Sequence, residues 1–252
     1  MITAQDSAAL VVAGALAGLV GTAGGITSLI SYPALLAVGV PALPAAIANN
    51  VALVAYGPGA ALASRPELRG RGRWLRGVAV VSVVGGAVGA GLLLTTPAGA
   101  FRRIVPFLVI AGVLALVLEP HLGTRRRQDH AQRHPFILVG LLFVLALYNG
   151  YFGAGSGVMT LTALLVLVDR RLVTANALKN VLVGAGVGAA AIVFALAGPV
   201  RWQAAGPLAL GMLIGSSVGP RVTRRLPARW LRLIIALLGL VLAIELLINP
   251  SL

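Results

Sequence analysis

The chain has 252 residues, of which 59% are hydrophobic and only 10% are charged, and its mean hydropathy is +0.98. A soluble domain of this size needs far more polar residues to cover its surface, and a transmembrane β-barrel would show alternating segments of about ten residues. The net charge is +14, but the arginines lie in short loops between apolar blocks, where such residues orient a protein in a bilayer rather than bind nucleic acid. The sequence therefore predicts an all-α polytopic membrane protein.

The first apolar block, residues 8–40, is longer than one membrane span and is interrupted by glycines at residues 21–25. A span needs about 20 apolar residues to cross the hydrocarbon core. Three ordinary blocks follow, at residues 42–64, 77–95 and 104–118. We expect residues 1–118 to form a first membrane repeat.

A polar linker at residues 119–135 separates the two apolar halves. It contains three consecutive arginines at residues 125–127 and all three histidines, His121, His130 and His134. Their spacing matches no zinc motif. We therefore interpret the segment as a solvated basic loop on the cytoplasmic side, and we predict no metal and no cofactor.

The second half repeats the pattern of the first. Residues 136–168 form another long block, which glycines break at residues 153–157, and ordinary blocks follow at residues 174–197, 204–219 and 231–248. We expect residues 136–252 to form a second membrane repeat.

Glycine motifs recur in the same order in both halves. Gly18-x-x-Gly21-x-x-x-Gly25 matches Gly150-x-x-Gly153-x-x-x-Gly157, and Gly85-x-x-x-Gly89 matches Gly215-x-x-x-Gly219. Glycine-interrupted segments at matching positions of two halves point to a transporter binding site. The second motif is more typical of close helix packing.

The arginines decide between two topologies. If each glycine-broken block crossed the membrane once, the arginines would divide almost evenly between the two sides. If each block enters and returns on one side as a hairpin, only Arg102, Arg103 and Arg201 lie opposite all the others, as the positive-inside rule requires. Each half is then a hairpin plus three transmembrane helices, the halves are inverted repeats, and both termini lie outside the cytoplasm. The hairpin arms, roughly 14 to 17 residues each, are short for a span, although two tilted spans would give the same arginine distribution.

Two stretches of the chain carry a family resemblance. The first half contains Gly18-Leu-Val-Gly21-Thr-Ala-Gly-Gly25 and Pro33-Ala-Leu-Leu, and the second contains Gly150-Tyr-Phe-Gly153-Ala-Gly-Ser-Gly157 and Ala175-Asn176-Ala-Leu-Lys179-Asn180. These stretches resemble the TauE/SafE family of membrane permeases, also called the sulfite exporter family. The resemblance implies movement of small anions, often sulfur oxyanions or organosulfonates, across the cytoplasmic membrane. Ala48-Asn49-Asn50 stands where the family often carries Thr-Asn-Lys, so a neutral amide replaces a cation.

The candidate substrate-binding residues lie at the glycine breaks and in the amide-rich stretches that follow them. Backbone N–H groups at the hairpin tips, and the helix N-termini beside them, favour an anion, and hydroxyl and amide side chains can donate further hydrogen bonds. The predicted set is Gly21, Thr22, Gly24, Gly25, Asn49, Asn50, Asn149, Gly153, Gly155, Ser156, Gly157, Asn176, Lys179 and Asn180. The alternatives are helix packing for the glycines and interhelical hydrogen bonds for the asparagines.

Lys179 is the most informative of these residues, because it is the only lysine and lies inside an apolar block. An intramembrane charge costs about 2.5 to 3.5 kcal/mol on insertion scales. No acidic residue lies near it in the sequence, so we expect an anionic substrate as its partner. The alternative is a side chain that snorkels to the lipid headgroups.

The sequence thus predicts a secondary transporter of small anions in the cytoplasmic membrane, and the resemblance implies sulfite, organosulfonates or related organic acids as substrates. Its expected partners are this substrate and the lipid bilayer, with no nucleic acid, and a homodimer is left open. An interior-negative potential favours export of an anion, by about 2.3 kcal/mol per charge at 100 mV. Proton-coupled anion uptake, an intramembrane hydrolase that uses Ser156, and a membrane scaffold are the alternatives.

Overall fold

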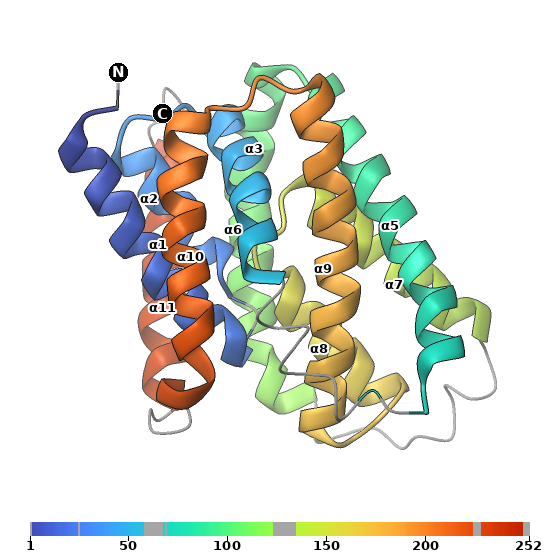
Figure 1. Cartoon of the computed structure of the whole chain (residues 1–252). Coiled ribbons are helices and arrows are strands. Elements are labelled where there is room, and N and C mark those ends of the chain that lie inside the picture. The colour runs from blue at the N-terminus through green and yellow to red at the C-terminus, as the bar shows by residue number, and fades with distance from the viewer. Residues whose placement is uncertain are drawn as a thin grey trace.

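The computed structural model describes residues 2–24, 26–57, 68, 70–122, 135–223 and 228–248, and Figure 1 shows their arrangement. Every secondary-structure element among these residues is a helix, which confirms the predicted all-α class. Gly25 lies outside the described residues, as does the part of the predicted linker that carries the arginine triplet, His130 and His134.

In the first half, a capping box starts the first helix. The Thr3 N–H donates to Asp6 Oδ2, and the Asp6 N–H donates to Thr3 Oγ1. The described helices of this half are α1 (Ala4–Gly24), α2 (Ser28–Ala37), α3 (Ala42–Leu53), the short 3-10 helix η1 (Val54–Tyr56), α5 (Gly72–Thr95) and α6 (Ala98–Leu122).

The second half follows the same order, with the predicted glycine break in place. Gly153 and Gly155 have φ angles of +80° and +72°, left-handed conformations that favour glycine, and they form the tight turn between α7 and α8. The helices of this half are α7 (Pro135–Tyr151), α8 (Ser156–Leu167), α9 (Leu172–Ala197), α10 (Trp202–Thr223) and α11 (Ala228–Ile248).

The break in the first half lies later than the sequence predicted. An interruption beginning at Gly21 is wrong, because α1 continues through Gly24 and α2 begins at Ser28. A glycine inside a helix costs only about 1 kcal/mol relative to alanine, so a helix that packs along its length, as α1 does against α10, can continue through one. With 21 residues, α1 is also longer than the predicted hairpin arm.

Four of the described helices are long and apolar enough to cross a bilayer: α1 over Ala4–Gly21, α5, α6 over Ala98–Leu118, and α9. The chain is therefore an integral membrane protein. The 12 residues of α8 rise only about 18 Å, short of the roughly 30 Å hydrocarbon core. With 10 residues, α2 is shorter still. The second arm of each broken block is thus too short to span.

Each half packs its first helix against the other half. In Figure 1, α1 lies along α10 and α7 lies along α5. A side-chain carbon at Gly215 would lie 1.9 Å from the carbonyl oxygen of Ala15, and one at Gly89 would lie 2.1 Å from that of Leu147. The expectation that Gly85, Gly89 and Gly215 serve helix packing is confirmed, since small residues let backbones approach closely in a membrane.

These contacts also give the direction of α1 relative to α10. Gly14 lies against Leu208 of α10. One turn later in α1, Gly18 lies against Met212, which is one turn later in α10. The two helices therefore run in the same direction.

The same register relates α5 to α7. Gly85 lies against Phe143, and one turn later Gly89 lies against Leu147. These helices also run in the same direction.

The short helix α8 returns to the end of the bundle at which α7 begins. Arg71, at the start of α5, donates to Asp169 in the α8–α9 connection. At the other end of α5, Leu94 lies against Gly198, which follows α9. Since α5, α7 and α9 all start at one end, α8 must run back toward that end. The α7–α8 pair is therefore a hairpin, as the sequence predicts.

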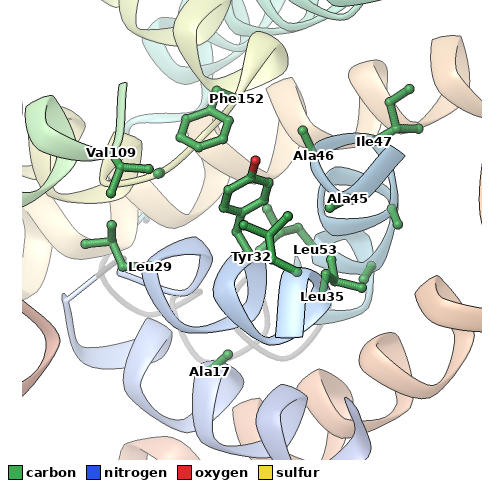
Figure 2. Packing of buried hydrophobic residues seen from close by; sticks show 14 of the residues in the cluster. Ala17, Leu29, Tyr32, Leu35, Ala45, Ala46, Ile47, Leu53, Val109 and Phe152 are labelled. Carbon is green, nitrogen blue, oxygen red and sulfur yellow. The ribbon is translucent and has the colours of Figure 1, made fainter. Parts of the chain in front are cut away.

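The main apolar core joins the two halves at the second glycine break. Tyr32 of α2 meets Phe152 edge-on, with ring centroids 5.0 Å apart and an interplanar angle of 81° (Figure 2). Phe101 of α6 also contacts Phe152, with centroids 6.1 Å apart. All three rings are buried. This packing holds α2, α6 and the break together.

Candidate functional site

A small cavity lies where the second glycine break meets the starts of α2 and α8 and the N-terminal part of α9. Its volume is about 30 Å³, which is room for one or two water molecules. Its described polar side chains are Thr27, Ser28, Asn149, Ser156, Lys179 and Asn180. The cavity therefore joins residues of both halves in the interior of the bundle.

Two helix N-termini reach this cavity, one from each half. α2 begins at Ser28 and α8 begins at Ser156, and both serines line the cavity. The first N–H groups of a helix have no partner within it, and a helix N-terminus carries a partial positive charge. The N-termini of α2 and α8 thus lie at one cavity, and their partial charges favour an anion there.

Lys179 brings a full positive charge to the cavity. Its side chain is 1% exposed, and its Nζ has no hydrogen-bond partner among the residues that the structure describes. Because Nζ is buried, Lys179 does not snorkel to the headgroups. A buried ammonium without a partner is strongly disfavoured, so a negatively charged partner would stabilise it at this position.

In the first half, Asn49 of α3 holds the hydroxyl group of Ser28 by a hydrogen bond. Asn49 Nδ2 donates to Ser28 Oγ at 3.1 Å, and Ser31 Oγ donates to Asn49 Oδ1. Because Ser28 Oγ accepts the bond from Asn49, its own proton stays available for an acceptor in the cavity. Asn49 thus orients Ser28 from behind the cavity wall.

Ser156, the corresponding serine of the second half, donates its hydroxyl proton within the protein. Ser156 Oγ donates to Asn149 Oδ1 at 2.6 Å, and Asn149 Nδ2 donates to the carbonyl oxygen of Val183 at 3.3 Å. The Ser156 proton is therefore engaged, and only the lone pairs of its oxygen remain for a ligand. Ser28 can donate to a ligand, whereas Ser156 can accept from one.

Asn50 lies behind the glycine break with one atom unsatisfied. Its Nδ2 donates to the carbonyl oxygen of Ala46 at 3.3 Å, while its Oδ1 is buried without a partner in the described part of the chain. A side-chain carbon at Gly153 would lie 3.7 Å from this Oδ1. The Asn50 oxygen therefore faces the backbone that lines the cavity.

The structure brings many of the predicted site residues together. Those that line the cavity are Asn149, Gly153, Ser156, Gly157, Lys179 and Asn180, and Asn49 and Asn50 stand directly behind it. Gly155 instead packs on α6, where a side-chain carbon would lie 2.6 Å from the backbone of Gly112. Asn176 is not among the residues that line the cavity, although its Oδ1 is buried without a partner in the described part of the chain, and Gly21 lies within α1. The side-chain surroundings of Thr22, Gly24 and Gly25 are outside what the structure describes.

Three hydroxyl residues of the site were not predicted from the sequence: Thr27, Ser28 and Ser31. They follow the first glycine break, which the sequence analysis placed too early. Serine and threonine are strongly preferred at helix starts. The pair Thr27-Ser28 was therefore the available signal for where α2 begins.

An ion cluster lies at the end of the bundle where α5 and α9 begin. Asp169 accepts hydrogen bonds from the Arg71 guanidinium and, at 2.9 Å, from the Arg171 backbone N–H. Burial raises the pKa of the Asp169 carboxyl, but the hydrogen bonds from Arg171 and the charges of Arg171 and Arg71 outweigh burial and hold the pKa below its ordinary value. The cluster fastens the first half to the second.

Comparison with known proteins agrees with these features. The family described as Sulfite exporter TauE/SafE matches residues 7–246. A "Probable membrane transporter protein ORF9" of Sinorhizobium sp is 30% identical over 246 residues, which cover 96% of this chain and 92% of that protein. A "Probable membrane transporter protein" of Haemophilus influenzae is 31% identical over 214 residues, which cover 83% of this chain and 82% of that protein. "Probable membrane transporter protein YfcA" of Escherichia coli K12 is 29% identical over 167 residues, which cover 66% of this chain and 62% of that protein. No solved structure matches the chain.

Proposed function

The chain belongs to the sulfite exporter TauE/SafE family of membrane transporters, and we propose that it is a secondary transporter that exports a small anion across the cytoplasmic membrane. The observation that carries this proposal is the buried Nζ of Lys179, which has no hydrogen-bond partner among the described residues and lies at a cavity where two helix N-termini meet. Sulfite, organosulfonates and related organic acids are the candidate substrates.

Substrate binding follows from the groups at the cavity. An oxyanion neutralises Lys179 with a charge-assisted hydrogen bond and accepts the proton of Ser28. The N-termini of α2 and α8 add their partial positive charges to the site. The cavity has room for only one or two water molecules, so the site must widen to admit a sulfur oxyanion.

The proposed architecture is a pair of inverted repeats, and the helix directions support it. α1 runs parallel to α10, and α5 runs parallel to α7. The short connection at residues 198–201 makes α9 and α10 antiparallel (Figure 1), so α5 and its counterpart α10 run in opposite directions. Inverted repeats around a central site allow one half to rock against the other and open the site to each side in turn.

The proposed orientation rests on the arginines. Arg71 and Arg171 lie at the end where α5 and α9 begin, whereas Arg102 and Arg201 lie near the starts of α6 and α10, at the opposite end. By the positive-inside rule, the first of these ends is cytoplasmic. α1 begins and α11 ends at the other end (Figure 1), which supports the proposal that both termini lie outside the cytoplasm.

The proposed direction is export. The interior-negative potential drives an anion outward without a partner ion. Proton-coupled uptake would require a carboxylate that relays protons near the substrate. No carboxylate is found among the described residues that line the cavity, which favours export.

An intramembrane hydrolase is the second candidate function, because Ser156 follows a glycine turn. A hydrolase needs a base that takes the serine proton. The Ser156 proton instead goes to the amide oxygen of Asn149, which is not a base. Ser156→Ala separates the two functions, since a hydrolase would lose all activity, whereas a transporter would lose only part of its affinity.

Anion efflux from proteoliposomes tests the proposal. Vesicles that contain the purified full chain are loaded with sulfite or an organosulfonate, and a potassium gradient with valinomycin sets a negative interior. We expect efflux that rises with the potential and falls sharply in Lys179→Gln. Unchanged efflux in a well-folded Lys179→Gln protein would reject the site, and absence of efflux for every anion tested would reject anion export.

A further inference from the structure

Directly behind the cavity wall, next to Gly153, lies a buried hydrogen-bond acceptor that an ordinary oxyanion leaves unused. Asn50 is completely buried, and its Oδ1 has no partner in the described part of the chain. The bond from Nδ2 to the Ala46 carbonyl fixes the amide so that Oδ1 points the other way. A buried amide oxygen without a donor is costly, so a ligand that supplies a donor is favoured.

A second acceptor lies on the same side of the glycine turn. A side-chain carbon at Gly153 would lie 3.5 Å from Asn149 Oδ1 and 3.7 Å from Asn50 Oδ1, so both amide oxygens converge on this glycine. Asn149 Oδ1 already accepts from Ser156, which leaves the Ser156 lone pairs toward the cavity. The donors of the site, Lys179 and Ser28, are therefore complemented by acceptors from Asn50 and Ser156.

The positive charge of the site also limits the negative charge that a bound anion can carry. Lys179 is the one charged side chain among the described residues that line the cavity. It neutralises a single negative charge, and the helix N-termini add only partial charges. A second negative charge would remain largely uncompensated in a buried site, which is strongly disfavoured.

We infer that the site takes a singly charged oxyanion that carries its own O–H or N–H donor. The inference rests on the proposed function, because it assumes that this cavity binds the transported anion. The charged end contacts Lys179 and Ser28 at the cavity, and the donor points past Gly153 toward Asn50 Oδ1, which becomes accessible when the site widens to admit the anion. A hydrogen oxyanion meets these requirements through an O–H group, and an amino- or hydroxy-substituted sulfonate meets them through N–H or O–H.

Isosteric anions test the donor directly. The purified full chain in detergent is titrated with sulfamate and methanesulfonate, two singly charged anions of equal size of which only sulfamate carries N–H donors. A second pair, hydroxymethanesulfonate and ethanesulfonate, tests an O–H donor, and sulfate tests the charge. We expect the donor-bearing member of at least one pair to bind about tenfold more tightly, because sites with buried polar groups reject ligands that leave them unpaired. The pair that responds identifies the donor type.

The outcomes separate the inference from the proposed function. Equal affinities within both pairs, or sulfate binding as tight as that of sulfamate, would overturn the inference and leave the anion site standing. Absence of binding for all five anions would instead count against the proposed function.

A variant pair locates the effect at Asn50. Asn50→Leu removes the acceptor at similar volume, so the ratio of the affinities for the donor-bearing and the donor-free anion of a pair should fall to about one. Ser216→Ala is the control, because Ser216 is a buried hydroxyl of α10 that bonds only locally, to the Leu213 carbonyl. A retained preference in a folded Asn50→Leu protein would overturn the assignment, and the wild-type pairs decide alone if that variant does not fold.

Discussion

The ring of Tyr32 meets the ring of Phe152 edge-on, and this contact joins the short arm α2 of the first half to the glycine break of the second. Phe152 directly precedes Gly153, which lines the cavity. The position of the cavity wall therefore depends on an aromatic contact between the two halves.

A double-mutant cycle measures this contact. Tyr32→Leu and Phe152→Leu should each destabilise the protein, and their effects should be non-additive by about 0.5–1.5 kcal/mol, the value of an aromatic pair beyond its buried area. Unfolding in detergent followed by tryptophan fluorescence or circular dichroism gives the four stabilities. Strict additivity would show that the two rings do not stabilise one another.

Two glycines of α10 give a matched test of the helix packing. Gly215→Ala would place a carbon 1.9 Å from the Ala15 carbonyl oxygen, so we expect a loss of about 1–3 kcal/mol from overpacking. Gly206 has nothing within 4 Å of such a carbon. Gly206→Ala should therefore be neutral or stabilising, by up to about 1 kcal/mol. Comparable melting temperatures for the two variants would be inconsistent with the close α1–α10 contact.

The ion cluster at Asp169 predicts a specific pH dependence. The folded protein holds the pKa of Asp169 below its unfolded value of about 3.9, so the ionised carboxylate stabilises the fold above that pH. The stabilisation is lost as the pH falls from the unfolded pKa through the folded pKa. Asp169→Asn should thus destabilise the protein by about 1 kcal/mol at neutral pH. Below the folded pKa the difference from the wild type should vanish, and a difference that persists there would contradict the assignment.

The helices and the glycine packing contacts could be predicted from the sequence, but the start of α2 could not. The α7–α8 break was predictable because Gly153 and Gly155 both adopt positive φ, a requirement that few other residues meet. Gly21 looks equivalent in the sequence but lies inside α1. Whether a glycine breaks a helix or lets it pack depends on the neighbouring helix, and here that neighbour, α10, lies in the other half.

The charged residue of the candidate site could be predicted from the sequence, whereas its hydroxyl residues could not. Lys179 stands out in the sequence as the single lysine, inside an apolar block. In the structure its side chain is buried. Ser28 and Ser31 gave no comparable signal, because serines also occur inside membrane helices. Their role depends on the hydrogen bonds with Asn49 of a different helix, and only the tertiary structure reveals that arrangement.

Lys179 should impose a trade-off between stability and binding. The Lys179 ammonium is buried without a partner in the described part of the chain, so replacing it by an apolar side chain of similar length removes a desolvation cost. We therefore expect Lys179→Met to melt at a higher temperature than the wild type in the absence of anions and to lose anion binding. A variant that melts at a lower temperature would indicate that the ammonium has a stabilising partner.

The most direct test of the central claim is an anion panel read by thermal shift on the wild type and on Lys179→Gln. Sulfite, thiosulfate, sulfoacetate and simple carboxylates are added in increasing concentration to the purified full chain. A ligand at 100 times its Kd stabilises the folded state by about 2.7 kcal/mol. We predict that at least one of these anions raises the melting temperature of the wild type, and that Lys179→Gln shows no such rise. Equal shifts in both proteins, or no shift with any anion, would contradict an anion site at Lys179.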